Sequence, residues 1–197
     1  RHNAPLSRRI DPGTTNIIDI YLVTQAYYIA YQNYVTDSTG TVPEPAKPTI
    51  DELTTSYSTL DQYKMISDNI ILNSATFKPL FGTKAAVELR ATLKCVKNPS
   101  STASVSEIKS QVVSSMNTYF TIDNWDFGDT FFFSELSAYL HDQLGSIIST
   151  VVLVPVDPLK SFGDLYEIRS QANEIFVNSA TVNDVEVIDA LTSSQLR

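Results

Sequence analysis

An amphipathic helix with a well-defined start is the feature that most constrains this fold. Ser104 is followed three residues later by Glu107. This is the pattern of a capping box, in which side chains accept hydrogen bonds from two backbone N–H groups at a helix start. At roughly 100° per residue, the apolar side chains of this segment fall within one arc of about 140°. They are Val105, Ile108, Val112, Val113, Met116, Tyr119 and Phe120. A stripe this wide predicts a helix that packs on a core.

The segment that follows predicts a second helix and then a strand. From about Ser134 to Leu144 the apolar residues form one stripe, and Gly145 then suits a left-handed C-terminal cap. Residues 147–156 are largely β-branched and almost continuously apolar, which is typical of a strand that is buried on both faces. The stripe of the second helix consists of Phe133, Leu136, Leu140 and Leu144.

The remaining patterns predict further strands and helices on both sides of this segment. Alternating residues predict strands over 16–23 and 84–96, and helical spacing predicts helices over 25–35 and near 50–66. The last part of the chain contains three short extended runs. They lie at residues 165–168, 174–177 and 185–188.

The order of these elements indicates the fold class. Runs of strands, then helices, then strands favour an α+β fold with mixed or antiparallel sheets packed against amphipathic helices. We expect two small α+β units, an N-terminal one over residues 1–80 and a C-terminal one over residues 81–197. Residues 36–49 contain three prolines and one aliphatic residue, so we expect a mobile loop there.

Charge and composition narrow the classes of partner. The chain of 197 residues has 22 acidic and 14 basic side chains, a net charge of −8 and no basic run longer than Arg8-Arg9. We therefore expect no nucleic acid ligand. The longest apolar stretch, residues 151–156, is far shorter than the ~20 residues of a spanning helix, so we expect no membrane partner. Cys95 is the single cysteine, which favours synthesis in a reducing cytosol.

Few side chains offer nucleophilic or acid–base chemistry. The chain has two histidines, His2 and His141, and these are too few for a histidine metal cluster. We expect His141 to lie at the edge of its helix stripe. Cys95 shares a strand face with Leu93, so an inert buried thiol is expected.

A carboxylate-rich segment raises the question of a metal site. An EF-hand loop needs oxygen ligands at positions where this segment has Trp125 and Phe127. The spacing therefore argues against calcium, and we expect no catalytic residue, metal or cofactor. The alternative is a metal-binding enzyme that uses Asp123, Asp126, Asp129 and Glu135.

Tyrosines recur at helical spacing near the N-terminus, at Tyr27, Tyr31 and Tyr34. Such a stripe is often core, and tyrosine is also over-represented in protein interfaces. Both readings stay open, and we take the three tyrosines as interface candidates.

The order of motifs from Ser104 to Val156 resembles a known family. A helix leads to Tyr119-Phe120, then to a Trp-x-x-Gly step at Trp125 and Gly128, and then to Ser-Glu-Leu at residues 134–136 before a helix and a strand. This order is similar to the C-terminal part of the baseplate J-like family, and within it to the large baseplate wedge proteins of T-even-type contractile-tailed bacteriophages.

Two flanking regions agree with this resemblance. Residues 7–12 lead into 16–21 near the start, and residues 173–176 and 184–187 lie near the end. We expect the N-terminal half of the family to be missing from this sequence. The chain begins with Arg1 rather than Met, so we expect it to be part of a longer protein.

The resemblance implies an architectural role. It implies a virion protein of the tail baseplate, made in the host bacterial cytoplasm, which contacts other wedge proteins and copies of itself to close the inner baseplate ring. No cofactor and no catalytic residues accompany that role. A ring subunit needs a rigid core and self-complementary patches rather than a convergent polar pocket.

Within this reading, four residues shape a corner between the two helices. Trp125 buries a large ring there and Gly128 permits the turn. Ser134 caps the second helix, and Glu135 is favourable to its dipole. A second alternative is a binding module with an aromatic ligand face, which an exposed Trp125 would indicate.

Overall fold

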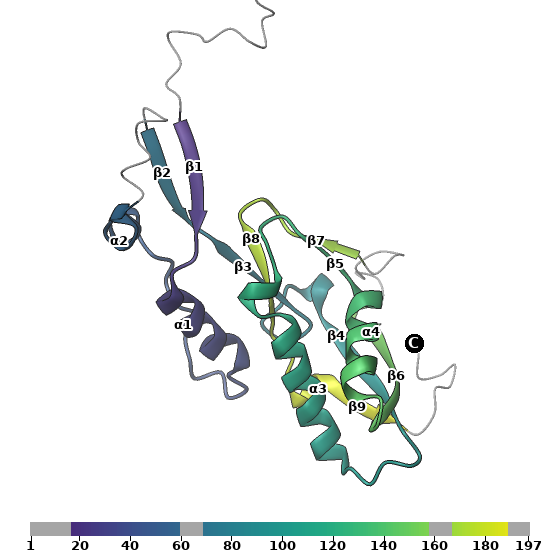
Figure 1. The fold of residues 1–197 in the computed structure, drawn as a ribbon. Helices are drawn as coiled ribbons and strands as arrows, with labels where there is room; N and C mark the ends of the chain where they lie inside the picture. Colours follow the sequence, from purple (N-terminus) through teal and green to yellow (C-terminus); the bar gives the residue numbers. More distant parts are fainter. Residues whose placement is uncertain (1–16, 60–68, 158–166, 189–197) are drawn as a thin grey trace, which may run out of the picture. The chain divides into compact units, whose positions relative to one another are not determined.

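The computed structural model describes residues 17–59, 69–157 and 167–188, and its helices and small sheets confirm the α+β class (Figure 1). The chain divides into two compact units, one of residues 1–28 and 46–75 and the other of residues 29–45 and 76–197. This division differs from the expected boundary at residue 80. The reason is strand pairing, because β3 (Thr76–Leu80) pairs with β8 (Glu174–Asn178) of the second unit.

The first unit contains a two-stranded parallel sheet and one short helix. β1 (Ile17–Leu22) pairs with β2 (Asn69–Ser74) over its whole length. α2 (Ile50–Ser56) contacts β2 and buries Leu53. The helix predicted near 50–66 ends at Ser56, earlier than expected. Residues 60–66 lie outside the described residues.

α1 (Gln25–Thr36) forms where helical spacing predicted it, and the boundary between the units falls after its residue 28. No helix or strand follows until α2. In this connection the Asp37 carboxylate accepts hydrogen bonds from the backbone N–H groups of Thr39 and Val42 and from the Thr39 hydroxyl. These donors lower the pKa of Asp37 well below its usual range. Mobility of residues 36–49 stays a prediction.

The second unit holds three small sheets among its described residues. β4 lies at the centre of a three-stranded sheet, antiparallel to β6 and parallel to β9. The strands of this sheet are β4 (Ala91–Lys97), β6 (Ile148–Pro155) and β9 (Val185–Ile188). β3 pairs in parallel with β8, and β5 (Thr130–Phe132) pairs antiparallel with β7 (Glu167–Arg169).

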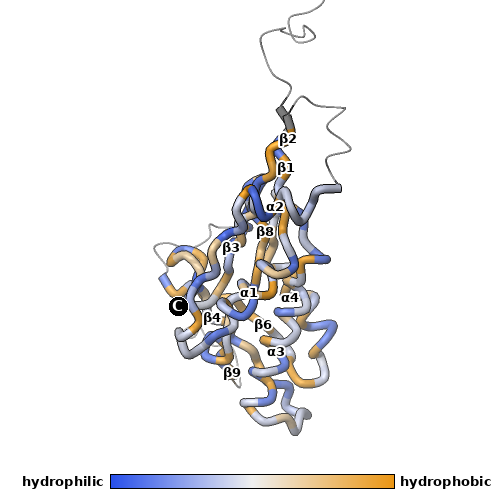
Figure 2. Tube along the Cα trace, turned by 90° about the vertical axis from the view of Figure 1, so that its left-hand side faces the viewer, coloured by the Kyte–Doolittle hydropathy of each residue, from blue (hydrophilic) through white to orange (hydrophobic). Residues whose placement is uncertain are grey.

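Two helices pack on one another and on the three-stranded sheet (Figure 1). α3 (Val105–Tyr119) contacts β9, and α4 (Phe133–Leu144) contacts β6. In Figure 2 both helices change between orange and blue along their length, as expected of helices with one apolar face. Full burial of Ile108, Val112, Met116, Leu136 and Leu140 confirms the centre of each predicted stripe, whereas Val105, assigned to the same stripe as Ile108, is 51% exposed at the start of α3. None of the helices in the described ranges is long and apolar enough to span a bilayer.

Half of the predicted capping box forms at the start of α3. The Ser104 hydroxyl accepts a hydrogen bond of 3.2 Å from the Glu107 N–H. The Glu107 carboxylate accepts a hydrogen bond from the Gln111 side chain at 3.3 Å. Ser104 therefore caps α3 as predicted, while Glu107 is engaged within the helix.

The strand predicted over 84–96 was wrong in its first half. Residues 84–90 form turns and a 3-10 helix (Val87–Leu89), and Val87 is exposed. The Phe81 N–H donates to the Leu89 carbonyl, and the Ala91 N–H donates to the Phe81 carbonyl. These bonds fold the segment back, so β4 begins only at Ala91.

Two expectations after α4 were also wrong. β6 is an edge strand with exposed Ser149 and Thr150, because β4 covers only one of its edges and the helices cover only one face. Gly145 is right-handed, with φ of −59°. A Cβ there would lie 2.7 Å from the His141 carbonyl oxygen, so close approach rather than a left-handed cap requires glycine.

Truncation of buried side chains on the apolar faces of α3 and α4 should destabilise the second unit. Met116→Ala and Leu140→Ala should each lower the free energy of unfolding by about 2–5 kcal/mol, because both side chains are fully buried. Ser114→Ala, on the exposed side of α3, should change it by less than about 0.5 kcal/mol. Urea midpoints measure the difference, and equal effects for all three variants would contradict these faces.

The thiol of Cys95 should be inert in the folded protein. Cys95 is fully buried in β4, and burial raises its pKa to about 12. At pH 8 we expect very slow reaction with a disulfide reagent such as DTNB, and rapid reaction after unfolding in urea. Fast stoichiometric labelling in native buffer would contradict the burial of this thiol.

Candidate functional site

A surface pocket of about 450 Å³ lies where the two helices of the second unit meet. It gathers side chains from the end of α3, the connection to β5 and the first turns of α4. These elements are consecutive in sequence, so the motifs from Tyr119 to Tyr139 build one continuous site. Its lining residues are Tyr119, Asn124, Trp125, Asp129, Thr130, Glu135 and Tyr139.

Side chains of this connection satisfy the last carbonyls of α3. The Trp125 indole N–H donates to the Tyr119 carbonyl at 2.9 Å. The Asn124 amide donates to the Thr118 carbonyl at 3.0 Å, as does the Thr121 hydroxyl. The last carbonyls of a helix lack intrahelical partners. These hydrogen bonds therefore terminate α3 and also hold the connection against the end of the helix.

Aromatic packing holds Trp125 in place. Its ring stacks on Phe120 with a centroid distance of 5.4 Å and an interplanar angle of 12°. It meets Phe176 of β8 edge-on at 5.1 Å, and Tyr119 at 5.6 Å. The side chain is 9% exposed, so the ring serves mainly as an internal anchor.

A tight turn follows Trp125 and brings Asp129 to the pocket. The Asp129 carboxylate accepts a hydrogen bond of 2.7 Å from the Asp126 N–H. Gly128, within the turn, has φ of +80°, a left-handed conformation that glycine adopts without strain. The turn thus depends on both an acceptor at residue 129 and a glycine at residue 128.

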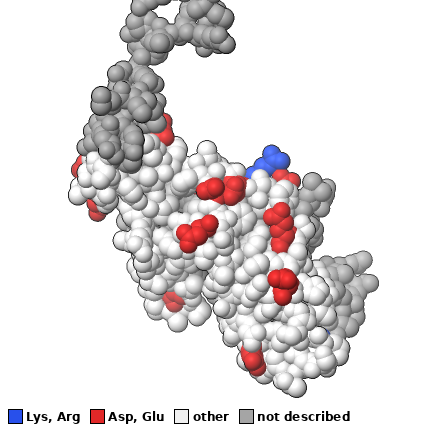
Figure 3. All heavy atoms as spheres, viewed as in Figure 1, with Lys and Arg blue, Asp and Glu red and all other residues white. Residues whose placement is uncertain are grey.

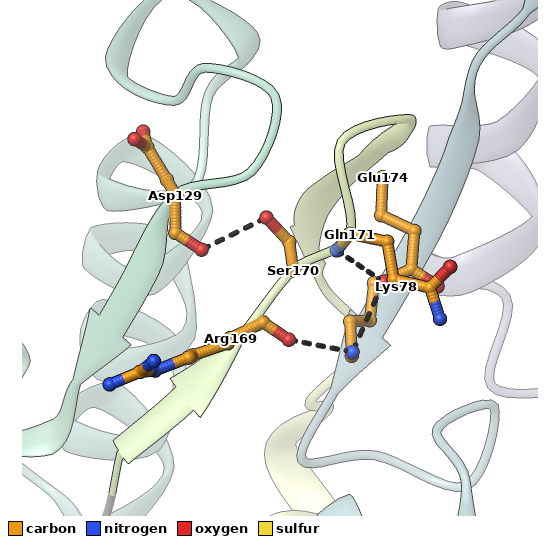
Figure 4. Close-up of polar contacts among 6 residues, drawn as sticks. All are labelled: Lys78, Asp129, Arg169, Ser170, Gln171 and Glu174. Carbon is orange, nitrogen blue, oxygen red and sulfur yellow. Dashed lines mark hydrogen bonds and ion pairs between the residues drawn. The ribbon is translucent and has the colours of Figure 1, made fainter.

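A polar clamp ties this turn to the segment between β7 and β8 (Figure 4). The Ser170 hydroxyl and N–H both donate to the Asp129 carbonyl, at 2.9 and 3.0 Å. On the other side of Ser170, Lys78 of β3 donates to the Arg169 carbonyl at 2.9 Å and pairs with Glu174 at 3.1 Å. Strands from three parts of the chain therefore support one rim of the pocket.

Tyrosine and carboxylate groups set the electrostatics of the pocket. The rings of Tyr119 and Tyr139 pack with centroids 5.1 Å apart. Burial, and secondly the negative charge of Glu135, raise the pKa of Tyr119 to about 12. The Tyr119 phenol is therefore a weaker acid than an ordinary tyrosine side chain.

The structure separates the predicted corner residues into two groups. Trp125 is buried and Gly128 is left-handed, as predicted. The prediction that Ser134 caps the second helix was wrong, because α4 begins one residue earlier, its N-cap is Phe132, and Ser134 lies exposed in the first turn. Glu135 is in the first turn, where a negative charge favours the helix dipole.

The carboxylate segment does not converge on one point. Asp129 and Glu135 line the pocket, whereas Asp123 and Asp126 are not among its lining residues. In the part of the chain that the structure describes, no three His, Cys, Asp or Glu side chains are placed to share a metal ion.

The tyrosine stripe of α1 is largely turned into the chain. Tyr27 is 5% and Tyr31 4% exposed. Tyr31 packs on Phe77 at 4.6 Å, and the Lys84 ammonium lies 4.3 Å from the centroid of Tyr34. The burial of Tyr27 and Tyr31 favours the core alternative for these two residues, whereas Tyr34 is half-buried, and the interface role of the stripe stays a prediction. Side chains packed inside the chain have little surface left for a partner.

Sequence reasoning missed Asn124 and Tyr139 as residues of the site. A usable signal existed for Tyr139, which follows Glu135 by four residues and so shares its helix face. Asn124 had no such signal, because its role depends on where the end of α3 lies in space.

Comparison of the chain with protein-family models and with curated proteins gave no match.

Substitution of Gly128 should test the turn. Gly128→Ala should lower the free energy of unfolding by about 1–2 kcal/mol, the penalty for a Cβ in a left-handed conformation. Added volume is not the cause, since a Cβ there would meet Ala172 at an ordinary 3.8 Å. Gly128→Asn is the matched control and should lose less, because asparagine tolerates this conformation. Urea midpoints measure both variants, and an unchanged Gly128→Ala protein would contradict the turn.

Proposed function

We propose that this chain is a structural component of a phage tail baseplate wedge. In this role it acts in the virion without a cofactor and without catalysis. It contacts other wedge proteins and associates with copies of itself to help close the inner baseplate ring. The proposal starts from the resemblance of residues 104–156 to the baseplate J-like family. It is supported by the packing of Trp125 and the turn at Gly128 within that segment.

The observation that carries the proposal is the internal use of the Trp-x-x-Gly step. Trp125 is stacked on Phe120, bonded to the end of α3 and almost wholly buried. Gly128 provides the left-handed residue of the turn. The residues that carry the resemblance thus shape a rigid corner, as an architectural subunit requires.

The two alternatives have less support. A binding module with an aromatic ligand face needs an exposed Trp125, whose ring is instead 9% exposed. A carboxylate-based metal enzyme needs its four acidic residues together, and only Asp129 and Glu135 share the pocket. One carboxylate oxygen of Asp129 is already engaged by the Asp126 N–H.

The contact between copies is expected to involve the outward side of α1. The tyrosines of this helix are largely packed, and its exposed large apolar residue is Ile29, at 51% exposure. A single exposed aliphatic residue is common on protein surfaces. The assignment of this surface therefore depends on the experiment below.

Sedimentation of the purified chain tests self-association. We expect a monomer–dimer or higher equilibrium that depends on protein concentration and tightens as salt rises, because each copy carries a net charge of −8. Measurements at several concentrations and two ionic strengths provide the readout. A strictly monomeric chain, with no binding to other wedge proteins, would remove the ring-closing role.

A matched pair of variants locates the contact. Ile29 on α1 and Val105 on α3 are both 51% exposed. Ile29→Ser should weaken association by about tenfold, the effect of losing an interface contact of some 1.4 kcal/mol. Val105→Ser should leave it unchanged. The reverse result would move the contact from α1 to the start of α3.

A further inference from the structure

The pocket between α3 and α4 has more features than a structural corner needs. Two tyrosine rings, Tyr119 and Tyr139, pack together along it. Glu135 lines the same pocket, and within the described residues no hydrogen bond or ion pair engages its carboxylate. The side chains that build the corner, Trp125 and Asn124, already donate to backbone carbonyls. The tyrosines and Glu135 are therefore the groups left for a ligand.

The lining of the pocket is acidic. Among the described residues, it contains the carboxylates Asp129 and Glu135 and no Lys or Arg. Arg169, the strand neighbour of Thr130, is paired with Glu167. Figure 3 shows red carboxylate groups spread over the face that carries α3 and α4, with far less blue. Such a surface attracts cations and raises their local concentration.

We propose that this pocket binds an arginine side chain presented by a different protein. A guanidinium group is planar, stacks on aromatic rings and donates two parallel hydrogen bonds to one carboxylate. Tyrosine rings and the Glu135 carboxylate supply these two kinds of contact side by side. The volume of about 450 Å³ accommodates a side chain with its flanking backbone.

Other cations fit the pocket less well. Calcium takes six to eight oxygen ligands, whereas the carboxylates that line the pocket are Asp129 and Glu135. A lysine ammonium is a compact, strongly hydrated charge that cannot pair with a carboxylate in the bidentate manner of arginine. Arginine uses both the aromatic wall and the carboxylate.

The arginine is assigned to a different protein on the ground of charge. The Arg90 guanidinium of this chain is occupied, because it donates to the carbonyls of Ala85 and Thr83 at 2.9 Å each. Arg169 pairs with Glu167 through Nε at 2.7 Å, and its side chain is 78% exposed. The net charge of −8 opposes the approach of a second copy to an acidic face. A partner with a basic loop has the complementary charge.

This inference does not depend on the baseplate role. If the role holds, the partner is another wedge protein. A failure of self-association would leave the pocket inference in place, and a failure of arginine binding would leave ring closure in place.

The test uses the full chain and two short peptides. One is acetyl-Gly-Gly-Arg-Gly-Gly-amide, and the other has the uncharged isostere citrulline in place of arginine. Trp125 is the single tryptophan and lines the pocket, so its fluorescence reports binding directly. NMR chemical shifts of the protein provide a second readout of peptide binding. We expect the arginine peptide to bind at least about tenfold more tightly than the citrulline peptide.

Two variants of equal charge separate the pocket from the general acidic field. Glu135→Gln should weaken binding of the arginine peptide by about fivefold or more, because it removes the charge beside the tyrosines. Asp142→Asn removes the same charge from the same helix, away from the pocket lining, and should weaken binding by less than about twofold. Circular dichroism checks that both variants keep the fold.

Four results would overturn the proposal. The first is equal binding of the arginine and citrulline peptides, and the second is equal weakening by Glu135→Gln and Asp142→Asn. The third is equal binding of a lysine peptide, which would show attraction of cations without selection for arginine. The fourth is dissociation of the self-associated protein by the arginine peptide, which would assign the arginine to a second copy.

Discussion

The second unit depends on a cluster of aromatic rings that joins elements far apart in the sequence. Phe120 ends α3, Trp125 follows it, Phe131 belongs to β5 and Phe176 to β8. Centroid distances between neighbouring rings of this cluster range from 5.1 Å for Trp125–Phe176 to 6.3 Å for Phe131–Phe176. Phe81, which adjoins β3, reaches Phe131 at 5.7 Å. Such rings bury large apolar areas and prefer specific relative orientations, so the cluster joins the end of α3 to the β3–β8 and β5–β7 sheets.

The polar contacts of the corner follow from this packing. With Trp125 held against Phe120, its indole N–H reaches the last carbonyl of α3. The turn that follows presents the Asp129 carbonyl to Ser170, and Lys78 supports the same segment from β3 (Figure 4). The apolar cluster thus positions the hydrogen bonds, and the hydrogen bonds restrict the loops. This rigidity is the physical link between the corner and the proposed architectural role, and it also preorganises the walls of the pocket.

Local sequence patterns correctly predicted the helices that bury one face and expose the other. The stripe of α3 and its cap at Ser104 were correct because helical spacing and a side-chain cap depend on neighbours within a few residues. β2 and β3 were not predicted, and β3 contains Pro79, which is disfavoured within strands. The strand expected from residue 84 failed because hydrogen bonds between Phe81 and the segment near Ala91 fold the chain back. A pairing of this kind has no periodic signal.

By itself, the sequence determined the α+β class, the two amphipathic helices and the inert environment of Cys95. Each of these follows from side-chain type and local spacing, whereas the corner roles of Trp125 and Gly128 were expected from the family resemblance. Tertiary structure alone decided the boundary between the units, since strand pairing places β3 with β8. It also turned Tyr27 and Tyr31 inward and gathered Asn124, Glu135 and Tyr139 at one pocket. Burial and convergence depend on which distant surfaces meet, and that is a property of packing over the whole chain rather than of any local stretch.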